Sequence, residues 1–222
     1  MAYKIKIITI REANFDISLT DVKTMMSLYG ELISTKSGRP HVEYEVLKRA
    51  AIILLVTAWE SFIEHMIVQE FENRLHNAKN PKDVQTAFNS FTASWSSKIV
   101  SKNIKPNELD ALTGDGWKML LLNMCRKEIS SFNSPNYDNI DRLFKKYFDA
   151  SAEQILKVPG YNKMWIRTNL NILINYRGNL VHRGKQVFGV SKGVPKQKVV
   201  KSIRVISGCV KSIEKYFKRL NQ

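Results

Sequence analysis

Residues 175–184, Asn-Tyr-Arg-Gly-Asn-Leu-Val-His-Arg-Gly, stand between an apolar helical run and the most basic part of the chain. They contain Arg177 and His182, two side chains suited to phosphate chemistry. A guanidinium is always charged and can hold a phosphate through two hydrogen bonds, and an imidazole can accept and release protons near neutral pH. The pair therefore predicts a site that acts on phosphate esters without requiring a metal.

The spacing of this pair predicts an irregular helix end. Five residues turn about 140° beyond one revolution, so Arg177 and His182 would lie on different faces of a regular helix. Gly178 and Asn179 are poor helix formers, and Gly184 lies where a left-handed C-terminal cap is expected. We therefore expect a loosened last turn that lets both side chains reach one cleft. In the alternative, purely structural interpretation, the pair stabilises the helix end and covers its surface.

Three stretches resemble, in their order, a HEPN domain of the RiboL-PSP-like branch. They are the Arg/His stretch 176–184, the apolar helix 51–63, and the segment 134–144 between them. The hallmark of that branch is Arg-x4-6-His near the end of a late helix, often with Asn directly after the Arg. Here Gly178 takes that place and Asn179 comes one residue later.

The resemblance implies a function and partners. It implies a ribonuclease that cleaves single-stranded RNA by attack of a ribose 2′-hydroxyl, with Arg177, His182 and Asn179 in its active site. Such domains usually form dimers in which two Arg/His sets meet, so a homodimer with a composite site is expected. Related proteins are often toxins of toxin–antitoxin or phage-defence systems, which implies an antitoxin partner. The alternatives are an inactive HEPN module that binds RNA or nucleotides, and a basic scaffold for an acidic partner.

A long helix predicted over 43–77 adds a carboxylate to the candidate site. Glu60 lies on it one turn before Glu64, and it could accept a hydrogen bond from Arg177 or orient His182. We assign Glu60 to the site and Glu64 to a solvated face. The apolar run 50–59 is shorter than the ~20 residues that span a bilayer, so a core helix and no membrane contact are expected.

The basic charge is concentrated at the C-terminus. From residue 183 to 222 there are eleven lysines and arginines and one acid, Glu214, which makes +10 of the formal +15 of the whole chain. Apolar residues recur there at helical spacing, so an amphipathic helix would present a cationic face. Such a face binds phosphate polymers through counterion release. The alternative is a solubilising surface or a contact with acidic lipids. The residues that we assign to RNA binding are Arg183, Lys185, Lys211, Lys215 and Lys218.

Composition and periodicity predict an all-α bundle of five to seven helices with at most a small N-terminal β appendage. The chain of 222 residues is 44% hydrophobic, which is enough for a sizeable core. Alternation at residues 3–8 suits a short strand that would pair with 186–190. A helix over 19–33 would be capped by Thr20 and Asp21. Residues 1–40 would flank a main domain of residues 41–222.

Later segments predict further helices and no cofactor. Helical spacing marks 84–100, 117–132, a helix begun by 133–136, and 162–182. The inward side chains expected of the second and third of these are Met119, Leu120, Leu122, Met124 and Ile129, then Ile140, Leu143, Phe144, Tyr147 and Phe148. Cys125 and Cys209 lack partners at zinc or redox spacing, so reduced thiols, a cytoplasmic location and no metal are expected.

Overall fold

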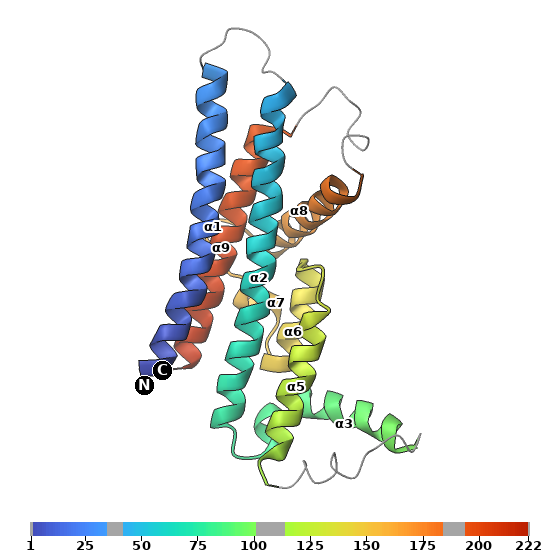
Figure 1. The fold of residues 1–222 in the computed structure, drawn as a ribbon. Helices are drawn as coiled ribbons and strands as arrows, with labels where there is room; N and C mark the ends of the chain where they lie inside the picture. The colour runs from blue at the N-terminus through green and yellow to red at the C-terminus, as the bar shows by residue number, and fades with distance from the viewer. Residues whose placement is uncertain (1, 35–41, 101–113, 184–193, 222) are drawn as a thin grey trace. The chain divides into compact units, whose positions relative to one another are not determined.

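The computed structural model describes residues 2–34, 42–100, 114–183 and 194–221; the side chains of residues 2–13, 42, 98–100, 182 and 183 lie outside this description. Within these ranges the chain forms eight α-helices, two 3-10 helices and no strand (Figure 1). The predicted all-α fold is confirmed, with one helix more than expected. The elements are α1 (Ala2–Ser34), η1 (Val42–Tyr44), α2 (Glu45–Asn77), η2 (Pro81–Val84), α3 (Gln85–Val100), α5 (Gly116–Ser130), α6 (Tyr137–Phe148), α7 (Ala152–Ile155), α8 (Lys163–Arg183) and α9 (Lys196–Leu220).

These elements form two compact units. Unit 1 comprises residues 1–62, 134–137 and 156–222, and therefore α1, the first half of α2, α8 and α9. Unit 2 comprises residues 63–133 and 138–155, with the second half of α2, α3, α5, α7 and nearly all of α6. The predicted division at residue 40 stays a prediction, and α1 belongs to the same unit as the C-terminal helices.

In unit 1, α1 packs antiparallel to the first half of α2. The Phe15 ring lies 5.8 Å from the Phe62 ring, and the Lys48 ammonium lies 4.4 Å from the centre of the Tyr29 ring. The first contact joins the middle of α1 to a later part of α2, and the second joins a later part of α1 to the start of α2, so the two helices run in opposite directions. Apolar side chains buried at helical spacing on both helices explain the pairing, because each buries a stripe that it cannot bury alone.

Connecting segments of unit 1 are fixed by hydrogen bonds to residues far away in the sequence. The fully buried Trp59 of α2 donates its indole N–H to the carbonyl of Pro135 at 2.9 Å. The backbone N–H of Lys157 donates to the Ser212 hydroxyl of α9 at 2.8 Å. The buried indole N–H would cost free energy if left without an acceptor, so its bond fixes the segment at Pro135. The exposed bond to Ser212 links the segment at Lys157 to α9.

The N-terminal strand prediction is wrong, because residues 2–34 form the single helix α1. A helix satisfies its backbone groups within the segment, whereas a lone strand needs a partner. The proposed partner, residues 186–190, lies outside the described residues. Thr20 is not a cap either: it lies inside α1, and its hydroxyl donates to the carbonyl of Asp16, one turn earlier.

In unit 2, Arg74 joins α2 to the segment after α6. It donates to the carbonyls of Tyr147 and Asp83, each at 2.8 Å, and pairs with the Asp149 carboxylate. Asp149 has a positive φ of 53° and also accepts from the Thr86 hydroxyl of α3. These bonds stabilise a backbone conformation that residues other than glycine seldom adopt.

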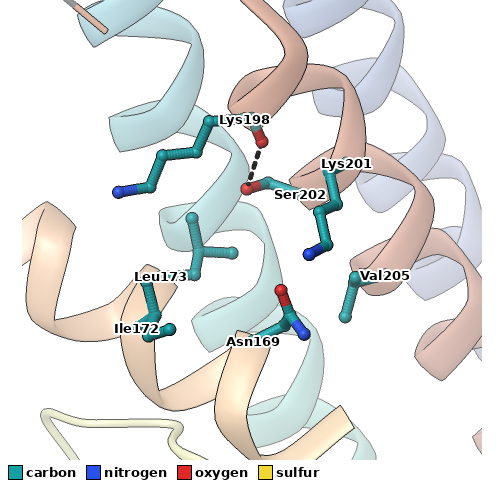
Figure 2. Close-up of a pocket in the computed structure, with 7 residues that line it drawn as sticks. All are labelled: Asn169, Ile172, Leu173, Lys198, Lys201, Ser202 and Val205. Carbon is teal, nitrogen blue, oxygen red and sulfur yellow. Dashed lines mark hydrogen bonds between the residues drawn. The ribbon is translucent and has the colours of Figure 1, made fainter. Parts of the chain in front are cut away.

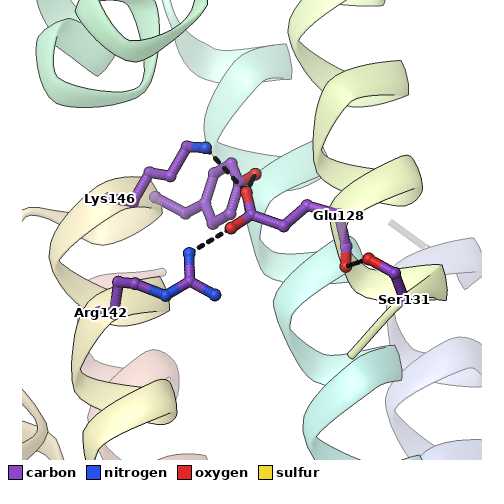
Figure 3. Close-up of polar contacts among 5 residues, drawn as sticks. Glu128, Ser131, Arg142 and Lys146 are labelled. Atoms are coloured by element: carbon purple, nitrogen blue, oxygen red, sulfur yellow. Dashed lines mark hydrogen bonds and ion pairs between the residues drawn. The ribbon is translucent and has the colours of Figure 1, made fainter. Parts of the chain in front are cut away.

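A second polar cluster joins α5 to α6. The Glu128 carboxylate of α5 accepts from Lys146 at 2.7 Å, from the Tyr147 hydroxyl at 2.6 Å and from Arg142, as Figure 3 shows for the two cations. The Ser131 hydroxyl donates to the Glu128 carbonyl at 2.9 Å. Burial acts to raise the pKa of Glu128, but the three hydrogen bonds outweigh it and lower this pKa from 4.5 to about 2. Glu128 is therefore charged over the whole physiological range.

The predicted inward faces are partly confirmed. All five side chains predicted for α6 are buried, as are Leu122 and Ile129 of α5. The side chain of Met119 is 58% exposed instead, and Leu120 and Met124 are only half-buried. The buried stripe of α5 runs through Trp117, Leu121 and Cys125. The predicted buried face was therefore rotated around the helix axis relative to the observed one.

By length and composition alone, α2 could cross a membrane, and more than half of its most apolar stretch is buried in the structure. A core helix of a soluble protein has the same two properties. Ala51, Ile52 and Leu55 are fully buried within unit 1. The predicted role of this stretch as a core helix accounts for its composition.

Candidate active site

Helix α8 carries the predicted Arg/His stretch and is regular throughout. It extends from Lys163 to Arg183 and passes through Gly178 and Asn179 without a break. The expected loosening at these two residues is therefore wrong. A helical glycine costs about 1 kcal/mol relative to alanine, and burial of Ile174 and Leu180 on either side offsets this cost.

Arg177 and Glu60 meet within unit 1. The Nη2 atom of Arg177 lies 3.6 Å from Oε2 of Glu60 on α2, and the two side chains are only 28% and 16% exposed. Burial raises the pKa of Glu60, and the charge of Arg177 acts in the opposite direction. The buried Nε of Arg177 has no hydrogen-bond acceptor among the described residues. The guanidinium is thus positioned by one carboxylate, and 28% of the Arg177 side chain stays exposed to solvent.

The remaining predicted residues of the stretch are only partly described. Asn179 is half-buried on α8, next to the buried Leu180. His182 and Arg183 form the end of α8, but their side chains lie outside the described residues, as does Lys185 altogether. Since α8 is regular, the backbone positions of Arg177 and His182 differ by about 140° around its axis.

Helix α9 presents the expected cationic face. Lys211, Lys215 and Lys218 are all exposed. The buried side chains on the opposite stripe are Val199, Ile206, Val210, Ile213 and Phe217. Two apolar residues of the predicted helical pattern, Val200 and Leu220, are exposed instead. The lysine face is therefore open to a large partner along α9.

The structure contains a small pocket between α8 and α9 that the distribution of charge along the sequence did not predict (Figure 2). Lys198 and Lys201 line it together with Asn169 and Ser202, all within unit 1. In sequence these two lysines look like the other members of the basic segment. Their positions next to aromatic residues of α8 distinguish them, and that proximity exists only in the folded chain.

The described residues contain no group of three or more His, Cys, Asp or Glu side chains placed to hold a metal ion. Both cysteines, Cys125 and Cys209, are buried, and burial raises the pKa of each thiol to about 12. They are therefore protonated at neutral pH and are poor nucleophiles.

Comparison with known protein families identifies the family of this chain. The family model described as RiboL-PSP-HEPN matches residues 22–219, which includes α8, nearly all of α9, the last part of α1 and both members of the Arg177–Glu60 pair. No curated protein and no solved structure matches the chain. Because the family match covers most of the sequence and the fold is all-α as the resemblance implied, the chain belongs to the RiboL-PSP-HEPN family.

Proposed function

We propose that the protein is a metal-independent endoribonuclease that cleaves single-stranded RNA by attack of a ribose 2′-hydroxyl on the neighbouring phosphate. The observation that carries the proposal is the position of the Arg177 guanidinium, 3.6 Å from the Glu60 carboxylate. Arg177 lies on α8, the helix that also contains His182. Family membership supports a ribonuclease or RNA-binding role, and this arrangement favours the ribonuclease.

Arg177 is suited to hold the scissile phosphate. Its Nη2 faces Glu60 and its Nε is buried, so a phosphate would bind the N–H groups on the part of the side chain that is exposed. A guanidinium has five N–H donors in a fixed plane, so the groups not used by Glu60 can bind phosphate oxygens. A positioned cation stabilises the charge that develops on the phosphate in the transition state. Glu60 acts as a positioning residue in this scheme.

His182 supplies proton transfer. It removes the proton of the 2′-hydroxyl or protonates the leaving 5′-oxygen. A single imidazole cannot easily do both at once, and a regular α8 separates the backbone positions of His182 and Arg177 by about 140°. A two-fold dimer would bring two Arg/His sets to one composite cleft. We include this homodimer in the proposal, with Asn179 as a polar neighbour in the cleft.

The biological setting belongs to the same proposal. RNA would reach the site along Lys211, Lys215 and Lys218, with Arg183 and Lys185 next to His182 in sequence. A cytoplasmic toxin of a toxin–antitoxin or phage-defence system would need an antitoxin protein as its partner. The second candidate is an RNA-binding module without catalysis. The unbroken helix at Gly178 favours it, because Arg177 and His182 then face different directions within one chain.

The decisive test is His182→Ala, with His76→Ala as the matched control on an exposed site of α2. Loss of the imidazole should lower the rate of RNA cleavage by about 10²–10⁴-fold and leave RNA affinity nearly unchanged. The product should end in a 2′,3′-cyclic phosphate, and a 2′-deoxyribose at the cut position should block the reaction. Undiminished cleavage by His182→Ala, or equal cutting of DNA, would leave the binding module as the better account.

Arg177→Ala tests the phosphate contact. Both the rate and the affinity should fall, because the guanidinium contacts the phosphate before and during the reaction. Arg167→Ala, on an exposed site of the same helix, is the control. Equal effects of the two substitutions would show that general charge, and not a fixed guanidinium, is responsible.

Mixing subunits tests the composite cleft. An Arg177→Ala chain and a His182→Ala chain, each inactive alone, should regain part of the activity when mixed if each cleft takes its groups from both chains. Light scattering that finds only monomers at the assay concentration would remove the dimer from the scheme.

A further inference from the structure

The pocket between α8 and α9 is small and lies wholly within unit 1. Its volume of about 30 Å³ admits one or two water-sized groups, such as oxygens of an anion that stays partly in solvent. Figure 2 shows α8 and α9 contributing opposite walls. Its lining residues are Asn169, Ile172, Leu173, Lys198, Lys201, Ser202 and Val205.

Both lysines of the pocket are held by aromatic rings. The Lys198 ammonium lies 3.7 Å from the centre of the Tyr176 ring, and the Lys201 ammonium lies 4.8 Å from that of Trp165. The Trp165 ring is itself stacked on Tyr161 at 3.8 Å. Contact with an aromatic face restricts a lysine stem, so less entropy is lost when the ammonium binds an anion.

The charges of both ammonium groups lack a carboxylate partner among the described residues. Within the described ranges, no carboxylate forms an ion pair with Lys198 or Lys201. Burial lowers the pKa of Lys198, which is the expected effect of a partly desolvated cation without a counter-charge. An anion in the pocket would supply the missing charge.

The start of α9 adds positive potential at the same place. Pro195 precedes the helix and makes no side-chain capping bond, and the first turn contains no acid. That turn carries Lys196 and Lys198 instead, although cations are unfavourable at the positive end of a helix dipole. Bound phosphate would relieve this unfavourable arrangement as well as the charge of the two pocket lysines.

The polar groups of the pocket floor are already oriented. Asn169 donates its amide N–H to the carbonyl of Trp165 at 2.7 Å, and the Ser202 hydroxyl donates to the carbonyl of Lys198 at 2.9 Å. In Figure 2 the Asn169 amide points toward the end of Lys201. These contacts hold both polar side chains against the backbones of their own helices, where they line the pocket.

We propose that Lys198 and Lys201 form a second phosphate subsite that binds the RNA strand next to the cleavage site. The proposal rests on the proposed function for the identity of the ligand. Leu173, which lines the pocket, precedes Arg177 by one turn of α8, about 6 Å along the axis. One extended strand can therefore contact Arg177 with one phosphate and the pocket with another.

Binding of a non-cleavable RNA measures the subsite without cleavage. In the His182→Ala protein, Lys198→Gln combined with Lys201→Gln should weaken binding of a 2′-deoxy-blocked RNA roughly tenfold at moderate salt. The slope of log Kd against log salt should fall by about 0.7, the value for one lost phosphate contact. The control is Lys23→Gln with Lys157→Gln, which removes equal charge from exposed sites of unit 1. Equal losses in the two double variants would overturn the subsite.

A second pair of variants keeps all lysines. Ile172→Glu places a carboxylate at the mouth of the pocket from a side chain that is 48% exposed, so the fold should survive. Val200→Glu, at a 43% exposed position of α9 outside the pocket, is its control. RNA affinity should fall at least several-fold more for Ile172→Glu, because the new charge neutralises the ammonium groups and repels phosphate. Equal effects of both would again overturn the proposal.

Two further outcomes separate the ligand sources and the two proposals. If the pocket variants lose binding of inorganic phosphate but keep full RNA affinity, the pocket is a small-anion site and the RNA subsite is wrong. If the unmodified protein binds RNA through the pocket but cleaves none, the ribonuclease proposal fails and the subsite stands. If it cleaves RNA while the pocket variants bind RNA like their controls, only the subsite fails.

Discussion

Glu128→Gln should destabilise the protein strongly, although it only replaces one carboxylate oxygen by an amide group. The substitution removes the negative charge that accepts hydrogen bonds from Lys146, Tyr147 and Arg142. The Tyr147 ring is fully buried, so its hydroxyl has little access to water once the acceptor is weakened. We therefore expect the loss to come from an unsatisfied buried group as well as from the missing charge.

The magnitude follows from the pKa of Glu128. A fall from 4.5 to about 2 corresponds to about 3 kcal/mol of stability that is present when the carboxylate is charged. Arg142 is about half exposed, and solvent screens that part of the interaction. We expect a loss of about 2 kcal/mol at pH 7 for Glu128→Gln.

The pH dependence gives a second measure of the same interaction. The folded-state pKa of Glu128 is depressed, so its contribution is complete above the unfolded value of 4.5 and is lost as pH falls toward about 2. The difference in free energy of unfolding between the unmodified protein and Glu128→Gln should therefore shrink to about half or less at pH 3. Urea unfolding at both pH values measures it.

Glu72→Gln is the matched control. Glu72 pairs with Arg126 at 3.5 Å in the same unit, but both side chains are about half exposed, so the pair should contribute at most about 0.5 kcal/mol. The reasoning is refuted if Glu128→Gln costs no more than Glu72→Gln, or if its cost is the same at pH 3 and pH 7.

Four other predictions concern packing and the site. Gly208→Ala should lower the free energy of unfolding by about 1–3 kcal/mol, because a Cβ atom there would lie 2.6 Å from the stiff, buried Val158. Gly30→Ala meets nothing closer than 3.8 Å and should leave Tm unchanged or raise it, so similar Tm values for the two variants would contradict this. Glu60→Gln should slow RNA cleavage about 10- to 100-fold by releasing Arg177, and an unchanged single-turnover rate would show that Glu60 does not position it. Cleavage should persist in EDTA, since the proposed proton transfer and phosphate contact use protein groups alone, and a lost activity that Mg²⁺ restores would reject this chemistry. Triple replacement by Gln on the cationic face of α9 should weaken RNA binding and flatten its salt dependence, and an unchanged slope would place the RNA elsewhere; the three residues are Lys211, Lys215 and Lys218.

Local periodicity was enough to predict most helices and several of their buried faces. The stripe of α6 from Ile140 to Phe148 is buried as the spacing indicated, and so is most of the apolar stripe of the amphipathic α9. Helical spacing is a property of neighbouring residues, so it can be read without knowledge of the fold. The Arg/His stretch and the family resemblance were likewise visible in the sequence, and the family match over residues 22–219 confirms the latter.

The tertiary structure alone decided which distant groups meet. The sequence suggested Glu60 as a partner of Arg177, but only the packing of α2 against α8 gives their distance of 3.6 Å. Nothing in the basic segment distinguished Lys198 and Lys201 from the exposed lysines of α9. The alternation at the N-terminus also suited a strand, but the chain is helical there. Sequence patterns report which face of a segment is apolar; the partner of each charge depends on how separate helices pack, because electrostatic and hydrogen-bond energies are set by distances between residues far apart in the chain.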